Sequence, residues 1–253
     1  MSEPSIAEVL SNVANVYASC RSYRDDGDVV STIVGKPPLE LRNTARQPFS
    51  TVFQRPDRFR FEFRGMTGGS EEKWEHYVIW SEEGLTRSWW TLRPEVEIGR
   101  SIEAAIGAAA GVSKGSSCTI PSLLIGTTEL RSSLPPAEAV SALIRESWNG
   151  HDCIRIDFSV YPNQVSSYWI DAASSLILRI VERTNFTAGF IEAHRRQFAR
   201  HVEAKPGAFG DQAGAIVEYA RREVTPFEAY EETTYRPDLS VDLAPDAFEF
   251  TPP

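Results

Sequence analysis

The sequence predicts a mainly β protein built on an antiparallel sheet, with a helix at the N-terminus and further helices along the chain. In residues 58–64 charged side chains alternate with Phe59, Phe61 and Phe63, which therefore share one face of a strand. One buried face and one charged face suit an antiparallel sheet better than a parallel one. Asn149-Gly150, the strongest two-residue hairpin signal, separates two further strand-like stretches.

Length and composition favour one domain spanning residues 1–253. A chain of 253 residues can bury a full core, and 42% hydrophobic with 24% charged residues is typical of a globular protein. The net charge of -9 argues against nucleic acid or an anionic membrane surface as the main partner, although local basic patches stay open. No stretch is apolar enough to predict a transmembrane segment.

The N-terminal region predicts an amphipathic helix. Ser5 and Glu8 have the spacing of a capping box, and apolar residues follow at helical intervals for about four turns. A turn is expected at Ser22–Gly27. Residues 1–5 lack the basic and apolar regions of a signal peptide, so either the protein stays inside the cell or an export signal lies outside this sequence. Strands are predicted next at Asp28–Val34, Gln47–Gln54, Arg58–Arg64, Glu75–Trp80 and Leu85–Thr91.

Helical spacing returns over Ile98–Gly111, in a segment rich in alanine and glycine. Each glycine inside a helix costs about 1 kcal/mol relative to alanine, so we expect this helix to be marginal and movable. Pro121–Gly126 predicts a short helical turn, with proline at its start and glycine at its end. The preceding aromatic strands need a cover, and these two helices are the expected cover.

The second half predicts a meander of sequential strands with one helical insert at 186–212. The strands are expected at Ala142–Trp148, His151–Tyr161, Gln164–Asp171, Leu176–Arg183, Ala215–Val224 and Phe227–Tyr235. Within the insert, Phe190–Glu203 suits a helix and carries Arg195, Arg196 and Arg200 in an otherwise acidic chain. This basic rim is either a solvated helix face or a contact surface for an acidic partner or a lipid headgroup.

No catalytic, metal or cofactor site is predicted. In a strand Asp152 points away from His151 and Cys153, so a nucleophile, base and orienting group do not converge there. A hydrolase using His151 and Cys153 is the remaining enzyme alternative. His194 and His201 lie seven residues apart, too far for a one-turn zinc pair. Cys20, Cys118 and Cys153 form no CxxC pattern; we expect three reduced thiols, with one disulfide plus one free thiol as the alternative.

Several short motifs, spread over nearly the whole chain, carry a family resemblance. They include Arg55-Pro56-Asp57-Arg58-Phe59-Arg60, Tyr168-Trp169-Ile170-Asp171 and the closing residues 247–253. The chain resembles the lipoprotein-carrier superfamily typified by LolA, LolB and the lipid-sensing domain of RseB. The resemblance implies a curved, incomplete antiparallel β-barrel of about eleven strands, covered by the N-terminal helix and by lid helices. It also implies a periplasmic or cell-envelope location, and Arg55, Pro56 and Arg58 match the family motif.

The resemblance and the aromatic sheet together predict a non-enzymatic binding or carrier protein for a lipid, a lipoprotein acyl chain or another apolar ligand. Each buried methylene contributes about 0.8 kcal/mol, so an acyl chain needs no polar contact. The alternatives are a lipid-sensing or envelope-stress module of the RseB type, and a core that its own rings fill. The predicted ligand-binding residues are Phe59, Phe61, Phe63, Tyr77, Ile79, Trp89, Ile102, Ile106, Leu124 and Trp169.

Overall fold

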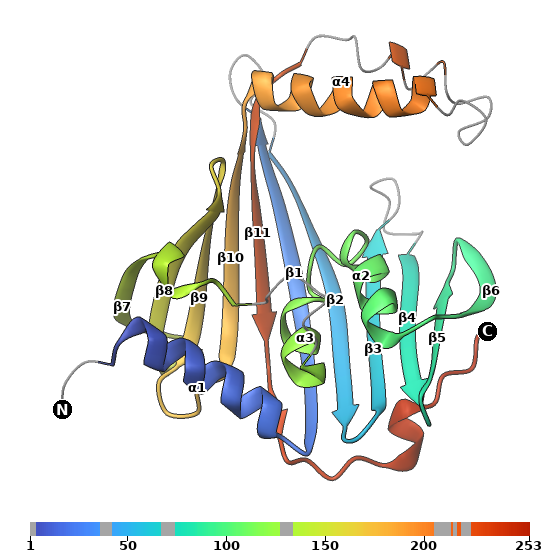
Figure 1. Ribbon diagram of the computed structural model, residues 1–253, viewed down its shortest axis with the longest axis vertical. Helices are drawn as coiled ribbons and strands as arrows, with labels where there is room; N and C mark the ends of the chain where they lie inside the picture. Colours follow the sequence, from blue (N-terminus) through green and yellow to red (C-terminus); the bar gives the residue numbers. More distant parts are fainter. Residues whose placement is uncertain are drawn as a thin grey trace.

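The computed structural model is built on a single antiparallel sheet (Figure 1). It describes residues 4–35, 42–66, 74–126, 134–204, 214, 217–218 and 224–253. The strands are β1 (Ser22–Gly35), β2 (Arg42–Gln54), β3 (Arg58–Met66), β4 (Trp74–Glu82), β5 (Leu85–Trp90), β6 (Arg93–Ile98), β7 (Val140–Trp148), β8 (His151–Tyr161), β9 (Gln164–Asp171), β10 (Ile177–Phe186), β11 (Phe227–Tyr235) and β12 (Asp238–Leu239). The main helices are α1 (Ile6–Ser19), α2 (Ile102–Ala110), α3 (Thr119–Ile125) and α4 (Ala188–Ala204), with short 3-10 turns η1 (Ala137–Ala139) and η4 (Pro245–Phe248).

The sheet has the order β6-β5-β4-β3-β2-β1-β11-β10-β9-β8-β7, and β12 adds to the end of β1. Two meanders therefore meet where β1 pairs with β11. In the described part of the chain no pairing joins β6 to β7, so the barrel stays unclosed. The predicted fold class, a curved and incomplete antiparallel barrel of about eleven strands with covering helices, is confirmed.

One face of the sheet, called the inner face here, carries the main core. Phe59 and Phe63 of β3 lie opposite Phe53 and Phe49 of β2, so the alternation seen in the sequence forms a continuous ring surface. Helices α1, α2 and α3 cover this face (Figure 1). Tyr17 of α1 is fully buried, and its hydroxyl accepts a hydrogen bond from the backbone N–H of Ile177 in β10 at 3.1 Å.

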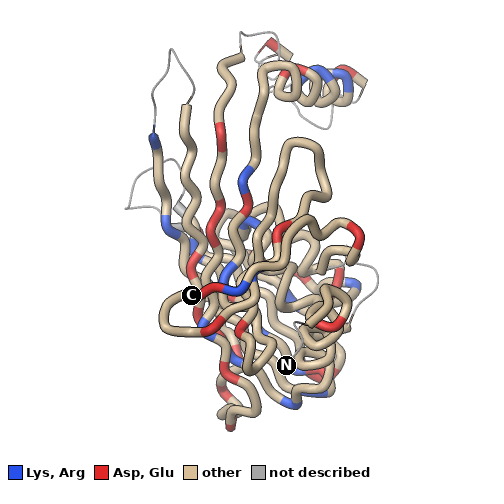
Figure 2. The backbone as a smooth tube through the Cα atoms, turned by 90° about the vertical axis from the view of Figure 1, so that its left-hand side faces the viewer, with Lys and Arg blue, Asp and Glu red and all other residues tan. Residues whose placement is uncertain are grey.

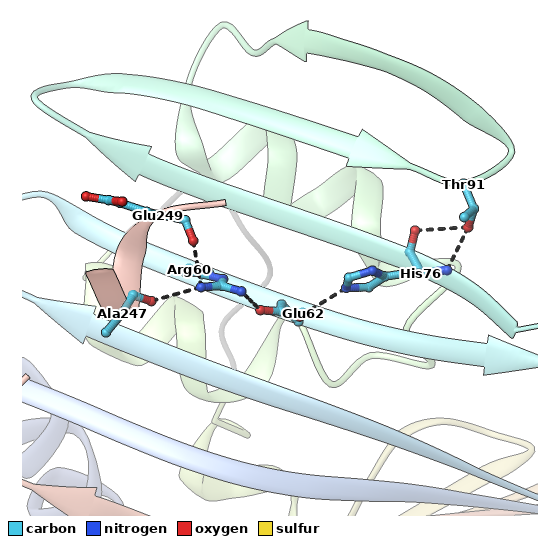
Figure 3. Close-up of polar contacts among 6 residues, drawn as sticks. All are labelled: Arg60, Glu62, His76, Thr91, Ala247 and Glu249. Carbon is cyan, nitrogen blue, oxygen red and sulfur yellow. Dashed lines mark hydrogen bonds and ion pairs between the residues drawn. The ribbon is translucent and has the colours of Figure 1, made fainter. Parts of the chain in front are cut away.

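The opposite, outer face holds a second cluster, made of Val78, Trp80 and Trp89 and covered by Phe250. Residues 244–250, called the C-terminal segment here, cross this face. The guanidinium of Arg60 donates to the backbone oxygens of Ala247 at 3.3 Å and Glu249 at 2.7 Å, and it also pairs with Glu62 (Figure 3). Arg58 donates to Pro245 O at 2.9 Å and lies over the Phe248 ring. The charged face of β3 thus anchors the end of the chain.

Two sequence predictions are wrong at their boundaries. Ser22–Gly27 is the start of β1 and not a turn: a Cβ on Gly27 would lie 2.1 Å from Phe49 Cζ, so this glycine makes room for a ring. Residues 93–98 form β6, and α2 begins at Ile102 behind an N-cap from Ser101. Ile98 is 69% exposed.

The other predicted elements agree with the structure, apart from the stretch Ala215–Val224. There Val217 and Glu218 are helical, which contradicts the predicted strand, and residues 215–216 and 219–223 lie outside the described residues. The helix of the insert is observed as α4, whereas residues 205–212 of the insert also lie outside the described residues. The N-terminal capping box is present, because Ser5 and Glu8 exchange hydrogen bonds.

Candidate functional site

The interface between helices α2–α3 and the inner face is the candidate site. Ile106, Ala109, Ile120 and Leu124 project from these helices and are fully buried against the sheet. α2 has nine residues and α3 has seven, lengths at which an isolated helix is marginal in water. Their position therefore depends on the apolar contacts that they make with the sheet and with α1.

Arg55 ties the ends of two helices together. Its side chain leaves the turn between β2 and β3, where the Arg55–Pro56 peptide bond is cis. Nε donates to Cys20 O at 2.9 Å and Nη2 donates to Ala18 O at 2.6 Å, at the end of α1. Nη2 also donates to Leu124 O of α3 at 2.9 Å. Carbonyls at a helix C-terminus lack intrahelical partners and attract a cation, so one guanidinium stabilises both ends.

Three further polar contacts, made by two side chains, join this segment to the sheet. The Thr119 side chain hydrogen-bonds with Tyr168 of β9 and Tyr235 of β11. Lys114 Nζ, between the two helices, lies 3.8 Å from Glu231 Oε1 of β11. Burial raises the pKa of Glu231, and the Lys114 ammonium lowers it. Among the described residues, Thr119 and Lys114 thus supply the few polar contacts between this segment and the sheet.

Glu231 lies directly across the strand pair from Glu182 on the inner face. Burial raises the pKa of Glu182, and the neighbouring carboxylate of Glu231 raises it further. Ser166 of β9 donates to Glu182 Oε1 at 3.3 Å. A polar row therefore borders the apolar part of the inner face at the level of Lys114.

Most of the predicted ligand-binding residues lie together. Six of them, Phe59, Phe61, Phe63, Ile79, Ile106 and Leu124, belong to the inner core cluster, and none is more than 3% exposed. Tyr77 and Ile102 are partly buried and pack against the same cluster. In this structure these side chains contact one another, so a ligand would have to take the place of protein contacts.

Trp89 is the exception, because it belongs to the outer cluster and not to this lining. Trp169 is buried and belongs to the main core cluster, but its side chain leaves β9 on the side away from Tyr168. Trp89 lies opposite Val78 on the outer face, whereas its neighbour Trp90 lies opposite Tyr77. The Trp169 ring lies between the guanidinium groups of Arg155 and Arg179, at 5.7 and 4.3 Å, on the face opposite Tyr168. Carrying the alternation of Phe59–Phe63 through β4 to β5 selects Trp90 for the inner face, because Phe63 pairs with Tyr77 and Tyr77 pairs with Trp90.

The enzyme alternative gains no support from the geometry. His151 Nδ1 lies 3.0 Å from Asp171 Oδ2 and is directed at a carboxylate. Cys153 is fully buried, and burial raises the pKa of its thiol, which disfavours the reactive thiolate. Cys20, Cys118 and Cys153 are free thiols. Within the described ranges no cluster of His, Cys, Asp and Glu could hold a metal ion, and no described helix is long and apolar enough to span a bilayer.

No protein-family model matches the chain, and no curated protein matches its sequence. Solved structures that are similar to it include a DUF1329 family protein from Desulfovibrio piger (9% identity, 98% of each chain, TM-score 0.37). Others are a putative outer membrane lipoprotein-sorting protein domain from Vibrio parahaemolyticus (10% identity, 95% of this chain and 94% of that one, TM-score 0.34) and a LolA superfamily protein from Nitrosomonas europaea (8% identity, 98% of this chain and 99% of that one, TM-score 0.30).

These similarities are too low to transfer a ligand, a partner or a residue role to this chain. The arrangement that the LolA resemblance implies, an unclosed antiparallel sheet with helices over one face, is nevertheless the arrangement observed.

Proposed function

We propose that this protein is a non-enzymatic binding protein that takes up an apolar chain, such as the acyl chain of a lipid or lipoprotein, between its inner face and helices α2–α3. The observation that carries the proposal is a mainly apolar helix–sheet interface with few polar contacts, among which, in the described part of the chain, Arg55 alone binds the ends of both α1 and α3. An acyl chain replaces the helix contacts on Phe61 and Ile79 with its own methylenes, each contributing about 0.8 kcal/mol.

Helix α3 is the element that moves when the interface opens. Arg55 makes bonds to Ala18 and Cys20 of the α1 end and a single bond to Leu124 of α3. Loss of the Leu124 bond releases α3 while Arg55 stays on α1. The contacts of Thr119 and Lys114 must also break. The closed form is then the resting state, and the ligand is bound by the fraction of molecules that is open.

Fluorescence titration with cis-parinaric acid tests the proposal, together with native mass spectrometry of the purified protein for bound lipid. Arg55→Leu removes the bond to Leu124 and raises the open fraction, so the apparent Kd should fall by about tenfold, as expected for a charged hydrogen bond of about 1.5 kcal/mol.

Arg58→Leu is the matched control. Arg58 stands three residues away, and its bond goes to Pro245 in the C-terminal segment and not to α1 or α3. It should leave probe affinity unchanged. Failure of the folded wild-type protein to bind cis-parinaric acid, or equal affinities for the two variants, would contradict the proposal.

A second candidate function, a sensing module that passes its ligand state to a partner, is favoured by α4. This helix lies at one end of the sheet and carries basic residues among acidic ones (Figure 1, Figure 2). Phe190 and Phe198 are 43% and 46% exposed on it. Arg196 pairs with Glu192 at 2.9 Å, and Arg200 is exposed, so the proposed contact surface rests on Arg200 and the two rings rather than on three equivalent arginines.

Chemical cross-linking in cells distinguishes the two roles. If α4 contacts a partner, Arg200→Glu with Phe198→Ser abolishes a cross-linked product that the wild type forms, while cis-parinaric acid binding is unchanged. A pure carrier without this contact gives the same cross-links with and without the substitutions.

A further inference from the structure

A pocket of about 730 Å³ lies at the end of the sheet where the β7–β8 turn, the β9–β10 turn and the end of β11 meet. This volume is within the range of small-molecule sites. Its lining comprises Trp148, Asn149, His151, Asp171, Ser174, Leu176, Leu178, Thr234, Tyr235, Arg236 and Pro237. Of these residues only Tyr235 also takes part in the helix–sheet interface, through its hydrogen bond with Thr119. Among the described residues, the polar groups of the rim make no polar contact with α2 or α3, so the sugar-binding groups are separate from the proposed function.

The pocket has an apolar floor and one aromatic wall. Leu176, Leu178 and Tyr235 are buried beneath it. Trp148 is half-buried, and the Arg179 guanidinium, which is not part of the lining, lies 5.8 Å from its ring centroid. Trp148 immediately precedes the tight Asn149-Gly150 turn, whose two residues have φ values of 49° and 85°. The indole is therefore a supported, partly exposed flat surface.

The polar groups at the rim are held in place but keep hydrogen-bonding capacity. Asp171 Oδ1 accepts from the N–H groups of Ala173 and Ser174, and Oδ2 contacts His151 Nδ1 at 3.0 Å. This orients the His151 ring and leaves its Nε2 without a partner among the described residues. In the same part of the chain the indole N–H of Trp148 and the side-chain amide of Asn149 also make no hydrogen bond.

The charges of the rim cancel. Arg236 supplies one positive charge, and its nearest partner is Asp28 Oδ2 at 3.4 Å. Asp171 supplies one negative charge. An anion is attracted by Arg236 and repelled by Asp171, and the reverse holds for a cation, so neither gains a net charge attraction. A neutral ligand that bears hydroxyl groups can satisfy donors and acceptors alike.

From the aromatic wall, the neutral rim and the unpaired donors, we propose that this pocket binds a saccharide. One face of a pyranose ring carries C–H groups and stacks on Trp148, while its hydroxyl groups hydrogen-bond with Asn149, His151 and Arg236. The ligand is either a free sugar or one unit of a longer glycan, because both present the same ring.

Saturation-transfer NMR with maltose, cellobiose, lactose and chitobiose tests this proposal, with glucuronate and glucosamine as charged comparisons. We expect transfer to at least one neutral disaccharide and weaker transfer to the charged sugars. Trp148→Ala should weaken binding by about tenfold or more. Asn149→Gly and His151→Ala test the rim without threatening the fold, since glycine accepts positive φ and His151 is 51% exposed on its side chain.

His194→Ala, an exposed histidine on α4, is the matched control and should leave transfer unchanged. Comparison of maltose with maltohexaose separates the two sources: tighter binding of the hexasaccharide indicates a glycan, and equal binding indicates a free sugar. Absence of transfer to all four neutral disaccharides, stronger binding of a charged sugar, or unchanged binding by both rim variants would overturn the proposal.

Discussion

At the scale of single residues, Asp25 is the least ordinary side chain of the inner face. It is almost fully buried in β1, and the Tyr23 hydroxyl donates to its Oδ2 at 2.8 Å. Burial raises its pKa from 3.8 to about 6, while hydrogen bonds with Tyr23 and Thr51 act in the opposite direction. The folded protein therefore holds a proton on this carboxyl at a pH where the unfolded chain has released it.

The pH dependence of stability follows from this shift. The contribution of protonated Asp25 to the free energy of unfolding is fully present below pH 4 and is lost as the pH rises through about 6. Asp25→Asn cannot ionise, so above this window it should exceed the wild type in free energy of unfolding by up to about 3 kcal/mol, and the gain should vanish near pH 4. Urea unfolding at several pH values measures it. A gain that does not change between pH 4 and 8 would contradict the shifted pKa.

The sequence predicts the faces of single residues better than their partners. The alternation of Phe59, Phe61 and Phe63 placed their faces correctly, because period two is a local property. Arg55 and Arg58 could be singled out by resemblance, but their partners could not. Leu124 and Pro245 are far away along the chain and offer backbone oxygens, which no side-chain pattern reveals.

At the scale of elements, two glycines control the helices that cover the inner face. Gly111 follows α2 with φ -66° and ψ -37°, a right-handed conformation that any residue adopts, and a Cβ there would have open space. Gly126 follows α3 with φ 72°, a left-handed conformation that favours glycine. The first glycine is replaceable and the second is not.

Alanine at the two positions should therefore act in opposite directions. Gly111→Ala is expected to raise the free energy of unfolding by about 0.5–1 kcal/mol, because it restricts the unfolded chain without strain, and to slow the uptake of cis-parinaric acid. Gly126→Ala should lower stability by about 1 kcal/mol. Thermal unfolding and stopped-flow fluorescence provide the two measurements. Equal stability effects at both sites would show that the backbone angles do not decide the outcome.

The element that sequence reasoning missed is β6. Its signal was present, since Leu92, Pro94, Val96 and Ile98 alternate with polar residues. Ile98 also fits the helical spacing of Ile102, so the predicted helix begins at Ile98, although this residue ends β6. Every residue of this edge strand is exposed, so it lacks the alternation of buried and exposed positions by which a half-buried strand is predicted.

At the scale of the whole molecule, the C-terminal segment closes the outer face. Phe248 is buried beneath Arg58, and Phe250 contacts Trp80 and Trp89 with ring centroids 5.2 and 5.4 Å apart. Removal of residues 245–253 should lower the free energy of unfolding by about 3–5 kcal/mol, the usual cost of deleting a large buried ring. It should also shift tryptophan emission to longer wavelength, because Trp80 and Trp89 become hydrated.

Removal of residues 251–253 alone is the control for this truncation. These residues follow Phe250 and leave both ring contacts in place. We expect unchanged stability and emission. A similar loss from both truncations would mean that the two phenylalanines do not carry the effect.

The fold class could be predicted from the sequence, but the pairing of strands that are distant along the chain could not. Local patterns give most strands and their sequential pairing. The pairing of β1 with β11, which makes one sheet from two meanders, joins residues about two hundred positions apart. No local signal encodes it, because both strands offer similar half-buried surfaces.

The placement of β1 has a consequence for biosynthesis. Its neighbour β2 follows it directly in the chain, whereas β11, Phe248 and Phe250 emerge from the ribosome much later. Until then one edge of β1 has no partner strand, and Trp80 and Trp89 are not covered by Phe250. A chaperone that shields extended apolar segments would be most needed during that interval, and least needed once β11 and Phe250 have been synthesised.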